Sequence, residues 1–333
     1  MTIVQFLRKK RPYANYSVEG LYTNTRKSLQ DRAEIQVVEC PFYSNGFFPR
    51  LFNCIYASFK QRDVNHVTGD VNYLNLFFTK NKNIVTILDC GLLERLTGIK
   101  QKVAKLFWFT IPVKRARFVV AISQATKNEI LKYVKCDPDK IKVIYVSVSD
   151  KFKRADKPFN KEKPVILHIG SAPNKNLKRL IEAVEGLNCR LEIVGKIPQD
   201  EIELLKAKNI DYTNSFDLTE TEMVNKYEEC DLLALVSTYE GFGMPIVEAN
   251  IVGRPVISSN LYSMPEVAGD ASLLVDPYNV SEIRNGITKI TNDDKYRNEL
   301  IENGYRNAER FKVDSIAQKY LELYKLTHKE NER

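Results

Sequence analysis

The chain has 333 residues, enough for two domains of ordinary size, and its 44% hydrophobic and 28% charged residues are typical of a globular protein. Its 14 glycines and 13 prolines exclude a collagen-like or low-complexity chain. The net charge of +8 is uneven, because residues 1–150 carry 24 Lys and Arg against 12 Asp and Glu, and the rest carry 26 against 30. The first half therefore either meets an anionic partner or membrane surface, or presents a solvated basic face.

The sequence shows neither a membrane span nor a metal motif. Its longest uncharged apolar run, 106–113, is far below the ~18–20 residues that cross a bilayer. The apolar residues 1–7 precede the basic residues 8–11, which is the reverse of a secretory signal. The six cysteines form no CxxC pair and there are three histidines, so we expect reduced thiols, no metal and a soluble, cytoplasmic protein.

In the first half, short β-branched or apolar runs alternate with amphipathic stretches such as 49–60 and 125–134. Strands separated by helices predict right-handed crossovers and a parallel sheet covered on both faces. The expected strands are 2–7, 35–39, 64–67, 84–88, 118–122 and 141–146.

Residues 150–163 are polar and lysine-rich, which is typical of an interdomain linker that permits domain closure. After them the alternation restarts, with helices expected from 177, 200, 219 and 244. The expected strands are 165–169, 190–194, 210–213, 232–236, 255–258 and 271–275. We predict an α/β protein of two doubly wound parallel-sheet domains, 1–155 and 156–312, facing each other across a cleft, with a final helix in 313–333 packing back on the first domain.

The motif with the most chemical content is STYEGFGMPIVE at 237–248. It follows a buried-strand run and opens a helix with Pro245, a residue suited to a first helical turn because its missing N–H would be unpaired there. Gly241 and Gly243 permit a tight turn whose amides face a ligand. A helix N-terminus with exposed amides favours an anion such as a pyrophosphate.

Two carboxylates bracket this turn, Glu240 before it and Glu248 one turn inside the helix. The helix around Glu248 is otherwise almost entirely apolar, so a half-buried carboxylate there needs hydrogen-bond donors. A ribose diol supplies two donors, and Glu240 is placed to accept from sugar hydroxyls beyond the phosphates. The alternative is structural: Glu240 caps the helix and Glu248 meets an internal Arg or Lys.

The spacing from Glu240 to Glu248 resembles the E-x7-E signature of retaining, nucleotide-sugar-dependent glycosyltransferases of family 4, which have the GT-B fold of two Rossmann-like domains. The likeness covers nearly the whole chain. Three further segments are similar to that family in the same order: VVAISQATKNEI (119–130), HIGSAPNKNLKRLIEA (168–183) and RPVISSNLYSMPEVAGDASLLVDP (254–277).

The resemblance implies that Glu248 binds the donor ribose, that Glu240 is a catalytic residue, and that Glu240 and the amides of the turn hold the sugar and diphosphate. The turn residues concerned are Gly241, Phe242, Gly243 and Met244. It further implies that Lys175 contacts the phosphates, although Lys175 also fits a plain surface lysine. His66 matches by position the histidine that the family projects into the cleft as a catalytic residue, or it is a packed histidine.

The chain departs from the family pattern at two places. Where many members have a phosphate-binding arginine after the glycine of the 165–169 strand, this chain has Ser171, which leaves Arg179 or Lys178 as the substitute cation. Where the family often has a glycine-rich loop after its first strand, residues 8–16 read RKKRPYANY, which suggests acceptor recognition by charge and stacking.

Three other features have open roles. His168, inside VILHIG, is expected in the core, and Asp89 matches a family aspartate although Leu88 replaces the histidine that usually precedes it. Residues 100–117 interleave basic residues with Leu, Phe and Trp, as in a helix lying on an anionic membrane. Alternatively, Phe107, Trp108 and Phe109 pack on the sheet while the cations face water.

The resemblance implies a retaining hexosyltransferase that uses no metal and moves a sugar from a nucleotide-diphosphate sugar to a glycan or lipid-linked glycan in cell-surface polysaccharide synthesis. Peripheral contact with the inner face of an anionic membrane fits this role, and nucleic acid is not an expected partner. A Rossmann oxidoreductase lacks its GxGxxG after the first strand. A GT-B sugar-nucleotide epimerase and a non-catalytic nucleotide-sugar-binding protein are the remaining alternatives.

Overall fold

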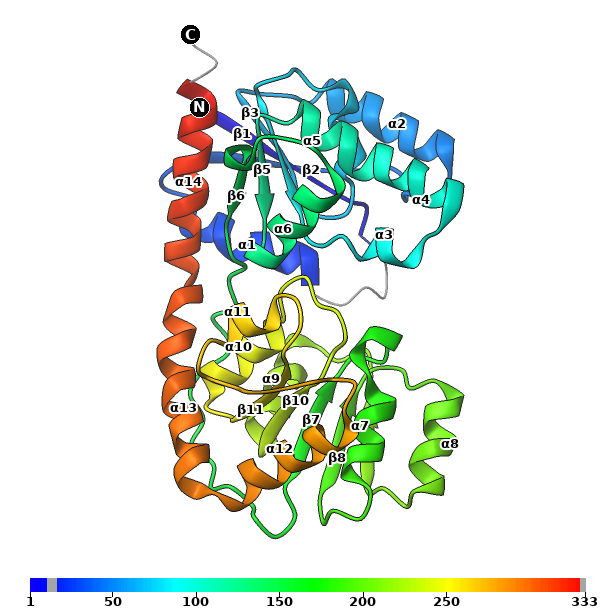
Figure 1. Cartoon of the computed structure of the whole chain (residues 1–333). Coiled ribbons are helices and arrows are strands. Elements are labelled where there is room, and N and C mark those ends of the chain that lie inside the picture. Colours follow the sequence, from blue (N-terminus) through cyan, green and yellow to red (C-terminus); the bar gives the residue numbers. More distant parts are fainter. Residues whose placement is uncertain (11–16, 330–333) are drawn as a thin grey trace. The chain divides into compact units, whose positions relative to one another are not determined.

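The computed structural model describes residues 1–10 and 17–329, with 17–19 and 21 described by their backbone alone. Residues 11–16, most of the loop in which acceptor recognition is expected, lie outside the described residues. The chain divides into two compact units, unit 1 (Met1–Ser147 with Val313–Arg333) and unit 2 (Val148–Lys312). Each unit is an α/β structure in its own right (Figure 1).

Unit 1 contains a six-stranded parallel sheet in the order β2-β1-β3-β4-β5-β6. Alternate side chains of each strand enter different cores: in β1, Val4 and Phe6 face one core, and Ile3 faces the other. The strands are β1 (Thr2–Leu7), β2 (Glu34–Glu39), β3 (Val64–Val67), β4 (Asn83–Ile87), β5 (Phe118–Ala121) and β6 (Ile141–Val143). The helical elements are α1 (Ser17–Leu29), α2 (Phe47–Ser58), η1 (Asn72–Phe77), α3 (Gly91–Arg95), α4 (Gly98–Ala104), η2 (Lys105–Thr110), α5 (Ile111–Arg115), α6 (Gln124–Tyr133), η3 (Pro138–Lys140) and α14 (Val313–Lys329).

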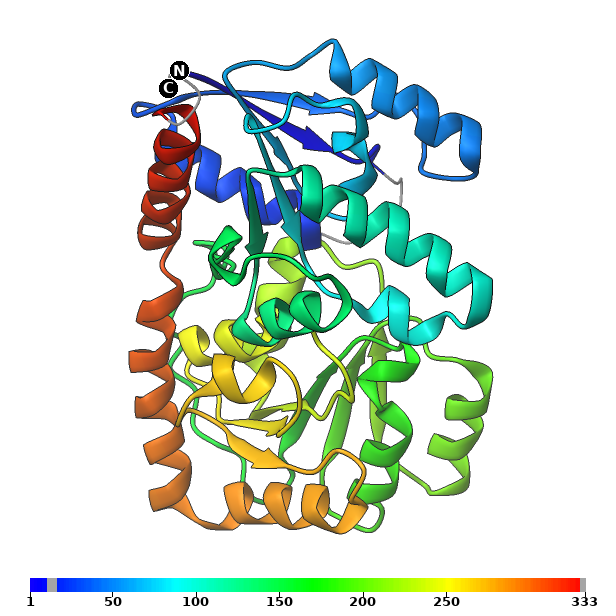
Figure 2. The same cartoon turned by 45° about the horizontal axis from the view of Figure 1, so that its top comes forward.

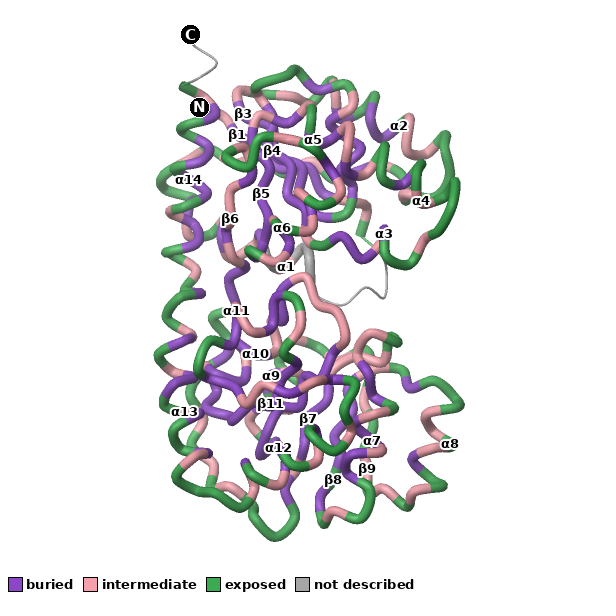
Figure 3. The backbone as a smooth tube through the Cα atoms, viewed as in Figure 1, coloured by how far each residue is buried: buried purple, intermediate pink, exposed green. Residues whose placement is uncertain are grey.

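Unit 2 repeats the architecture, with a parallel sheet in the order β12-β11-β10-β7-β8-β9 whose strands are mostly buried (Figure 3). Its strands are β7 (Val165–Ile169), β8 (Arg190–Val194), β9 (Tyr212–Ser215), β10 (Leu232–Leu235), β11 (Val256–Ser259) and β12 (Leu273–Val275). Its helical elements are η4 (Pro173–Lys175), α7 (Leu177–Val184), α8 (Gln199–Ala207), α9 (Glu220–Glu229), α10 (Met244–Val252), α11 (Met264–Ala268), α12 (Val280–Asn292), α13 (Asp294–Ala308) and η5 (Glu309–Phe311). Each strand predicted from the sequence overlaps a strand of the structure, so the two doubly wound parallel sheets are confirmed.

The segment 150–163 is not the free linker that its polarity predicts. Phe152 is buried, with its ring edge-to-face on Tyr227 at a centroid distance of 5.3 Å. The Lys157 ammonium pairs with the buried carboxylate of Asp231, and the Ala155 amide donates to the Val252 carbonyl at 3.2 Å. A few anchors therefore hold this hydrophilic segment against unit 2, and the change of unit falls at residues 147 and 148.

The last helix, α14, packs against α1 on one face of the sheet of unit 1 (Figures 1 and 2). Its Tyr324 is fully buried, and the hydroxyl accepts from Gln5 Nε2 at 3.0 Å and is 2.8 Å from His66 Nδ1. The other ring nitrogen of His66 lies 2.8 Å from Thr86 Oγ1, which also accepts from the Tyr22 hydroxyl at 2.9 Å. This buried network satisfies polar groups of the sheet only when α14 is in place.

Replacing Tyr324→Phe removes that hydroxyl and leaves Gln5 and His66 short of a buried partner. We expect the variant to lose about 1–3 kcal/mol of stability, the usual cost of an unsatisfied buried polar group. Urea unfolding followed by the fluorescence of Trp108, the chain's one tryptophan, measures it within unit 1. The control is Tyr133→Phe, which changes a half-buried tyrosine on α6. Equal urea midpoints for both variants and the parent would contradict a stabilising role for the network.

Candidate functional site

A buried serine, Ser263, stabilises the turn before α10. The Ser263 hydroxyl lies 2.8 Å from the Glu240 carbonyl and 2.9 Å from the Phe242 carbonyl. The side chain of Phe242 is buried, and its ring is edge-to-face on Phe311 at a centroid distance of 5.6 Å. The predicted role of Phe242 therefore falls on its backbone amide, because its ring belongs to the core.

The helix that follows begins as the sequence predicts. Gly243 is its N-cap residue, with a φ of 98° in the left-handed region that favours glycine, and α10 starts at Met244 with Pro245 in its first turn. No side chain in the described part of the chain caps this helix start. The positive end of the helix dipole thus lies beside the turn formed by Glu240 to Gly243, the geometry that favours an anion.

Lys175 reaches this turn from the loop after β7. Its Nζ lies 2.6 Å from Glu240 Oε1, and both side chains are only partly exposed, at 21% and 14%. The lysine chain lies directly over Gly170, where a Cβ would come within 2.8 Å of Lys175 Cγ and Cε. Gly170 also has a φ of 98°, so a side chain here would be strained as well as obstructive. The structure therefore brings together two residues that the sequence singled out separately.

Two asparagines that the sequence analysis missed join the loop after β7 to the loop after β10. The Asn174 carbonyl accepts from the Thr238 amide at 2.8 Å, and its Nδ2 donates to the Tyr239 carbonyl at 3.0 Å. The buried Asn176 has a left-handed φ of 64° and donates to the carbonyls of Val236 at 2.9 Å and Pro277 at 2.7 Å. The sequence could have indicated them, because asparagine favours turns and both lie between the expected strand 165–169 and the helix expected from 177.

Glu248 is half-buried on α10, and its Oε2 accepts a hydrogen bond from the hydroxyl of the fully buried Tyr227 on α9. Burial raises the pKa of Glu248 to about 7, against the opposing effects of the tyrosine hydrogen bond and the charge of Lys175. Its structural partner is thus a tyrosine, where the alternative interpretation expected an Arg or Lys.

The two candidates for the missing phosphate cation differ in position. Arg179 donates from Nη1 to Asn176 Oδ1 at 2.8 Å, and its guanidinium lies 5.1 Å from the ring centre of Tyr278. Lys178 is exposed on α7. Arg179 therefore supports the asparagine that joins the two loops, while Lys175 is the cation that the structure places against Glu240.

The structure corrects the catalytic role expected for His66. The residue lies within the central strand β3, has no exposed surface, and engages both ring nitrogens with Tyr324 and Thr86. Burial lowers the pKa of its imidazole to about 3, which keeps the ring neutral. In this structure His66 is therefore a core residue that contacts α14.

The remaining sequence candidates have structural roles. His168 is fully buried in β7, as expected, with Nδ1 3.3 Å from the Ala234 carbonyl. Asp89 accepts from the Gly91 amide at 2.8 Å at the start of α3. Within the described residues no three His, Cys, Asp or Glu side chains gather as a metal site, and no helix is both long and apolar enough to cross a membrane.

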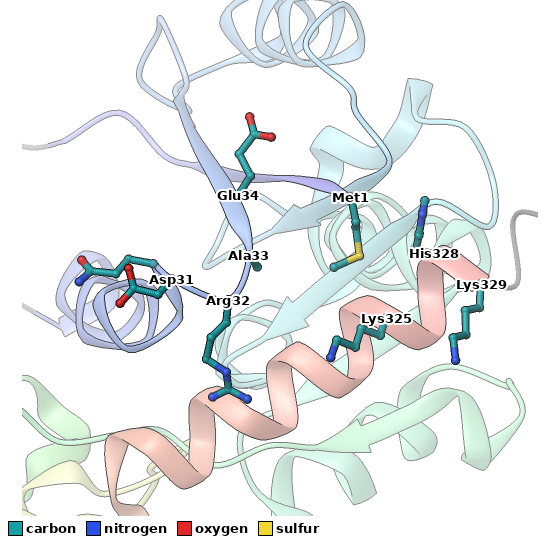
Figure 4. Close-up of a pocket in the computed structure, with 9 residues that line it drawn as sticks. Met1, Asp31, Arg32, Ala33, Glu34, Lys325, His328 and Lys329 are labelled. Atoms are coloured by element: carbon teal, nitrogen blue, oxygen red, sulfur yellow. The ribbon is translucent and has the colours of Figure 1, made fainter.

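An open hollow of about 680 Å³ lies elsewhere, in unit 1, between the end of α14 and the turn that joins α1 to β2 (Figure 4). Arg32, Lys325, His328 and Lys329 line it together with Asp31 and Glu34. This hollow has basic and acidic side chains but no helix N-terminus with a lysine beside it. The candidate site is therefore the turn before α10 in unit 2.

Comparison with known proteins identifies relatives of this chain. Residues 149–307, nearly all of unit 2, match the family model "Glycosyl transferases group 1". The Escherichia coli serotype-specific mannosyltransferase WbdA is 26% identical over 222 residues, 60% of this chain and 27% of that protein. The E. coli O-antigen chain mannosyltransferase B is 41% identical over 90 residues, 27% of this chain and 24% of that protein. The chain thus spans about a quarter of the length of these curated relatives.

The fold has close counterparts among solved structures. HepE of Anabaena, crystallised with UDP and glucose, superposes with a TM-score of 0.77 at 18% identity, covering 96% of this chain and 98% of that one. Sucrose-phosphate synthase of Thermosynechococcus elongatus gives 0.80 at 15% identity, covering 98% and 99%. The chain therefore has the GT-B fold, residues 149–307 match the glycosyl transferases group 1 model, and the resemblance to glycosyltransferase family 4 is confirmed.

The raised pKa of Glu248 makes the stability of unit 2 depend on pH. The folded carboxyl keeps its proton up to about pH 7, whereas the unfolded one releases it near pH 4.3, so stability falls as the pH rises between these values. Glu248→Gln, which cannot ionise, should gain about 1–2 kcal/mol over the parent at pH 8 and little at pH 4. Thermal unfolding by circular dichroism at both pH values measures it, with the exposed Glu229→Gln as control; parallel pH profiles would disprove the assignment.

Proposed function

We propose that the protein is a retaining glycosyltransferase that moves a hexose from a nucleotide-diphosphate sugar to a glycan or lipid-linked glycan in cell-surface polysaccharide synthesis. The observation that carries this proposal is the Lys175–Glu240 pair at the N-terminus of α10, with Glu248 one turn inside the helix. This arrangement offers a cation and a helix dipole for phosphates, and carboxylates for hydroxyls on either side of them.

The chemistry that these residues support is stabilisation of a leaving diphosphate. The bond between the anomeric carbon and the phosphate oxygen breaks, and the acceptor oxygen bonds to the same face of that carbon. The acceptor proton passes to a departing phosphate oxygen, which balances the exchange. In this proposal Lys175 and the N-terminal end of α10 stabilise the negative charge that develops on the departing diphosphate, and no step is assigned to a metal.

The two glutamates have different roles in the proposal. Glu240 accepts hydroxyls of the transferred sugar and keeps the Lys175 ammonium oriented. Glu248 accepts the ribose hydroxyls through Oε1, while the Tyr227 hydroxyl fixes the carboxylate through Oε2. Tyr227 is therefore a positioning residue for the ribose site.

The names of related proteins support the kind of donor and acceptor. Relatives include a serotype-specific mannosyltransferase and an O-antigen chain mannosyltransferase of E. coli. Another is an MMP α-(1→4)-mannosyltransferase of Mycolicibacterium hassiacum, 26% identical over 219 residues, 62% of this chain and 53% of that protein. A structural neighbour was crystallised with UDP-glucose. A nucleotide-activated hexose and a polysaccharide acceptor are consistent with each of these names.

Removing the proposed ribose acceptor should weaken nucleotide binding. We expect Glu248→Ala to reduce the affinity for the matching nucleoside diphosphate about tenfold or more at pH 8, where the carboxyl is ionised, because the ribose hydroxyls lose their acceptor. Calorimetric titration with uridine and guanosine diphosphates measures the change. Glu229→Ala on the exposed side of α9 is the matched control, and affinity equal to that of the control would remove the ribose role.

Removing Glu240 should separate turnover from binding. In Glu240→Ala the Lys175 ammonium loses its carboxylate partner and remains available to the diphosphate, so nucleotide affinity should hold or rise while turnover falls about a hundredfold or more. A thermal-shift panel of nucleotide sugars identifies the donor, and release of its nucleoside diphosphate measures turnover. Equal losses of affinity and turnover would indicate a purely binding role for Glu240.

A further inference from the structure

One helix of unit 1 has apolar side chains on its outer face. The inner face of α2 is buried against η1 through Asn53, Cys54 and Ala57, and the Cys54 thiol donates to the Tyr73 carbonyl at 3.4 Å. A surface helix ordinarily carries polar residues opposite such a face. The outer side chains of α2 and its end are instead apolar and exposed: Phe47 (70%), Phe48 (69%), Phe52 (54%), Ile55 (39%), Tyr56 (39%) and Phe59 (79%).

A second exposed apolar segment runs through α4 and η2. Ile99 is 80% exposed and Val103 48%, and Leu106 and Phe107 continue the row at 43% and 39%. Lys100, Lys102 and Lys105 alternate with these side chains and are exposed as well. Of the aromatic residues expected either on a membrane or on the sheet, Phe109 packs in the core, Trp108 packs on Tyr73, and Phe107 faces outward.

The two segments form one surface, which we call the docking face: the exposed side chains of α2, α4 and η2. Both α2 and η2 pack on η1, and the Arg50 guanidinium of α2 lies 4.6 Å from the ring centre of Trp108 in η2. Figures 1 and 2 show α2 and α4 on the same side of unit 1, and Figure 3 shows exposed stretches along both. An apolar surface of this extent on a soluble unit marks a site of interaction.

The charge around the docking face has one sign. The elements that form it, 47–58 and 98–110, carry Arg50, Lys100, Lys102 and Lys105 and no Asp or Glu, whereas Asp63, Asp70 and Glu94 lie outside them. Interfaces between proteins are depleted of lysine, whereas aromatic side chains mixed with lysines are typical of elements that lie at the surface of an anionic bilayer. The composition therefore favours lipid over a protein partner.

We propose that the docking face binds the surface of an anionic lipid bilayer, with the phenylalanines of α2 entering the interface and the lysines of α4 and η2 contacting the headgroups. The attachment lies in unit 1 and uses none of the residues assigned to the donor. Vesicle binding therefore tests this proposal without sugar transfer. Nucleotide affinity and turnover test the proposed function, so either proposal can be disproved without the other.

The full-length protein supplies its own probe, because Trp108 is the one tryptophan and lies within this surface. We expect the protein to sediment with vesicles of phosphatidylcholine and phosphatidylglycerol (7:3) but only weakly with phosphatidylcholine alone. The fluorescence of Trp108 should shift to the blue on binding and be quenched by brominated lipid. Raising the salt concentration should weaken the attachment, since headgroup contacts are screened.

Two variants separate the apolar and the charged contributions. We expect Phe47→Ser with Phe48→Ser, and separately Lys100, Lys102 and Lys105→Glu, each to lower the vesicle partition coefficient about tenfold or more. Matched controls in unit 2 are the exposed Phe216→Ser and the exposed Lys206, Lys295 and Lys312→Glu, which should bind as the parent does. All the substituted side chains are exposed, and circular dichroism establishes that each variant is folded.

The proposal would be overturned if the α2 and lysine variants sedimented with anionic vesicles as well as their controls do. Light scattering without vesicles tests the other occupant of such a face, a second copy of the chain. A dimer that dissociates in the Phe47, Phe48 variant, together with vesicle binding no stronger than that of the controls, would assign the face to self-association. Equal binding to neutral and anionic vesicles would remove the role of the lysines.

Discussion

The candidate site depends on the ion pair that joins Lys175 to Glu240 across two loops of unit 2. Each loop follows a strand of the same parallel sheet, and β7 and β10 are neighbours in it, so their carboxyl ends meet at one edge. The Lys175 chain crosses Gly170 because that position has no side chain. The partly buried pair would be costly without good geometry, and the asparagine bonds between the loops supply it.

The same loops give the site its rigidity. Ser263, Asn174 and Asn176 satisfy carbonyls of the turn before α10 and of its neighbours. Gly243, the N-cap residue of α10, has a left-handed φ, and no side chain among the described residues caps the helix start. Sites that hold dipoles in place before the reaction do not have to reorganise when charge develops, which is the main electrostatic advantage of an enzyme over water.

Much of the fold was predictable because buried parallel strands appear in the sequence as short runs of β-branched and apolar residues, as in 165–169 and 232–236. The spacing of Glu240 and Glu248 likewise predicted one carboxylate before and one within the helix. Contacts between distant segments were not predictable. Tyr227 reaches Glu248 from another helix, and Tyr324 reaches His66 across 258 residues, so a histidine that fits a catalytic position is a core residue.

Burial by tertiary contact also explains the other errors. Residues 150–163 have the composition of a linker, yet Phe152 and the Lys157–Asp231 pair fix them to unit 2. The sequence made no prediction for the phenylalanines of α2, and the structure shows them exposed on its outer face. Composition indicates which residues favour burial. Which residue covers them depends on contacts between segments far apart in the sequence.

The central claim is that Lys175 and the start of α10 bind the phosphates of a donor nucleotide. The most direct test is calorimetric titration of Lys175→Met, with the exposed Lys178→Met as control, using uridine and guanosine diphosphates and the corresponding nucleosides. We expect the Lys175 variant to bind the diphosphate about tenfold more weakly while its affinity for the nucleoside is unchanged. Diphosphate affinity equal to that of the control, or an equal loss for nucleoside and diphosphate, would contradict the placement of the phosphates.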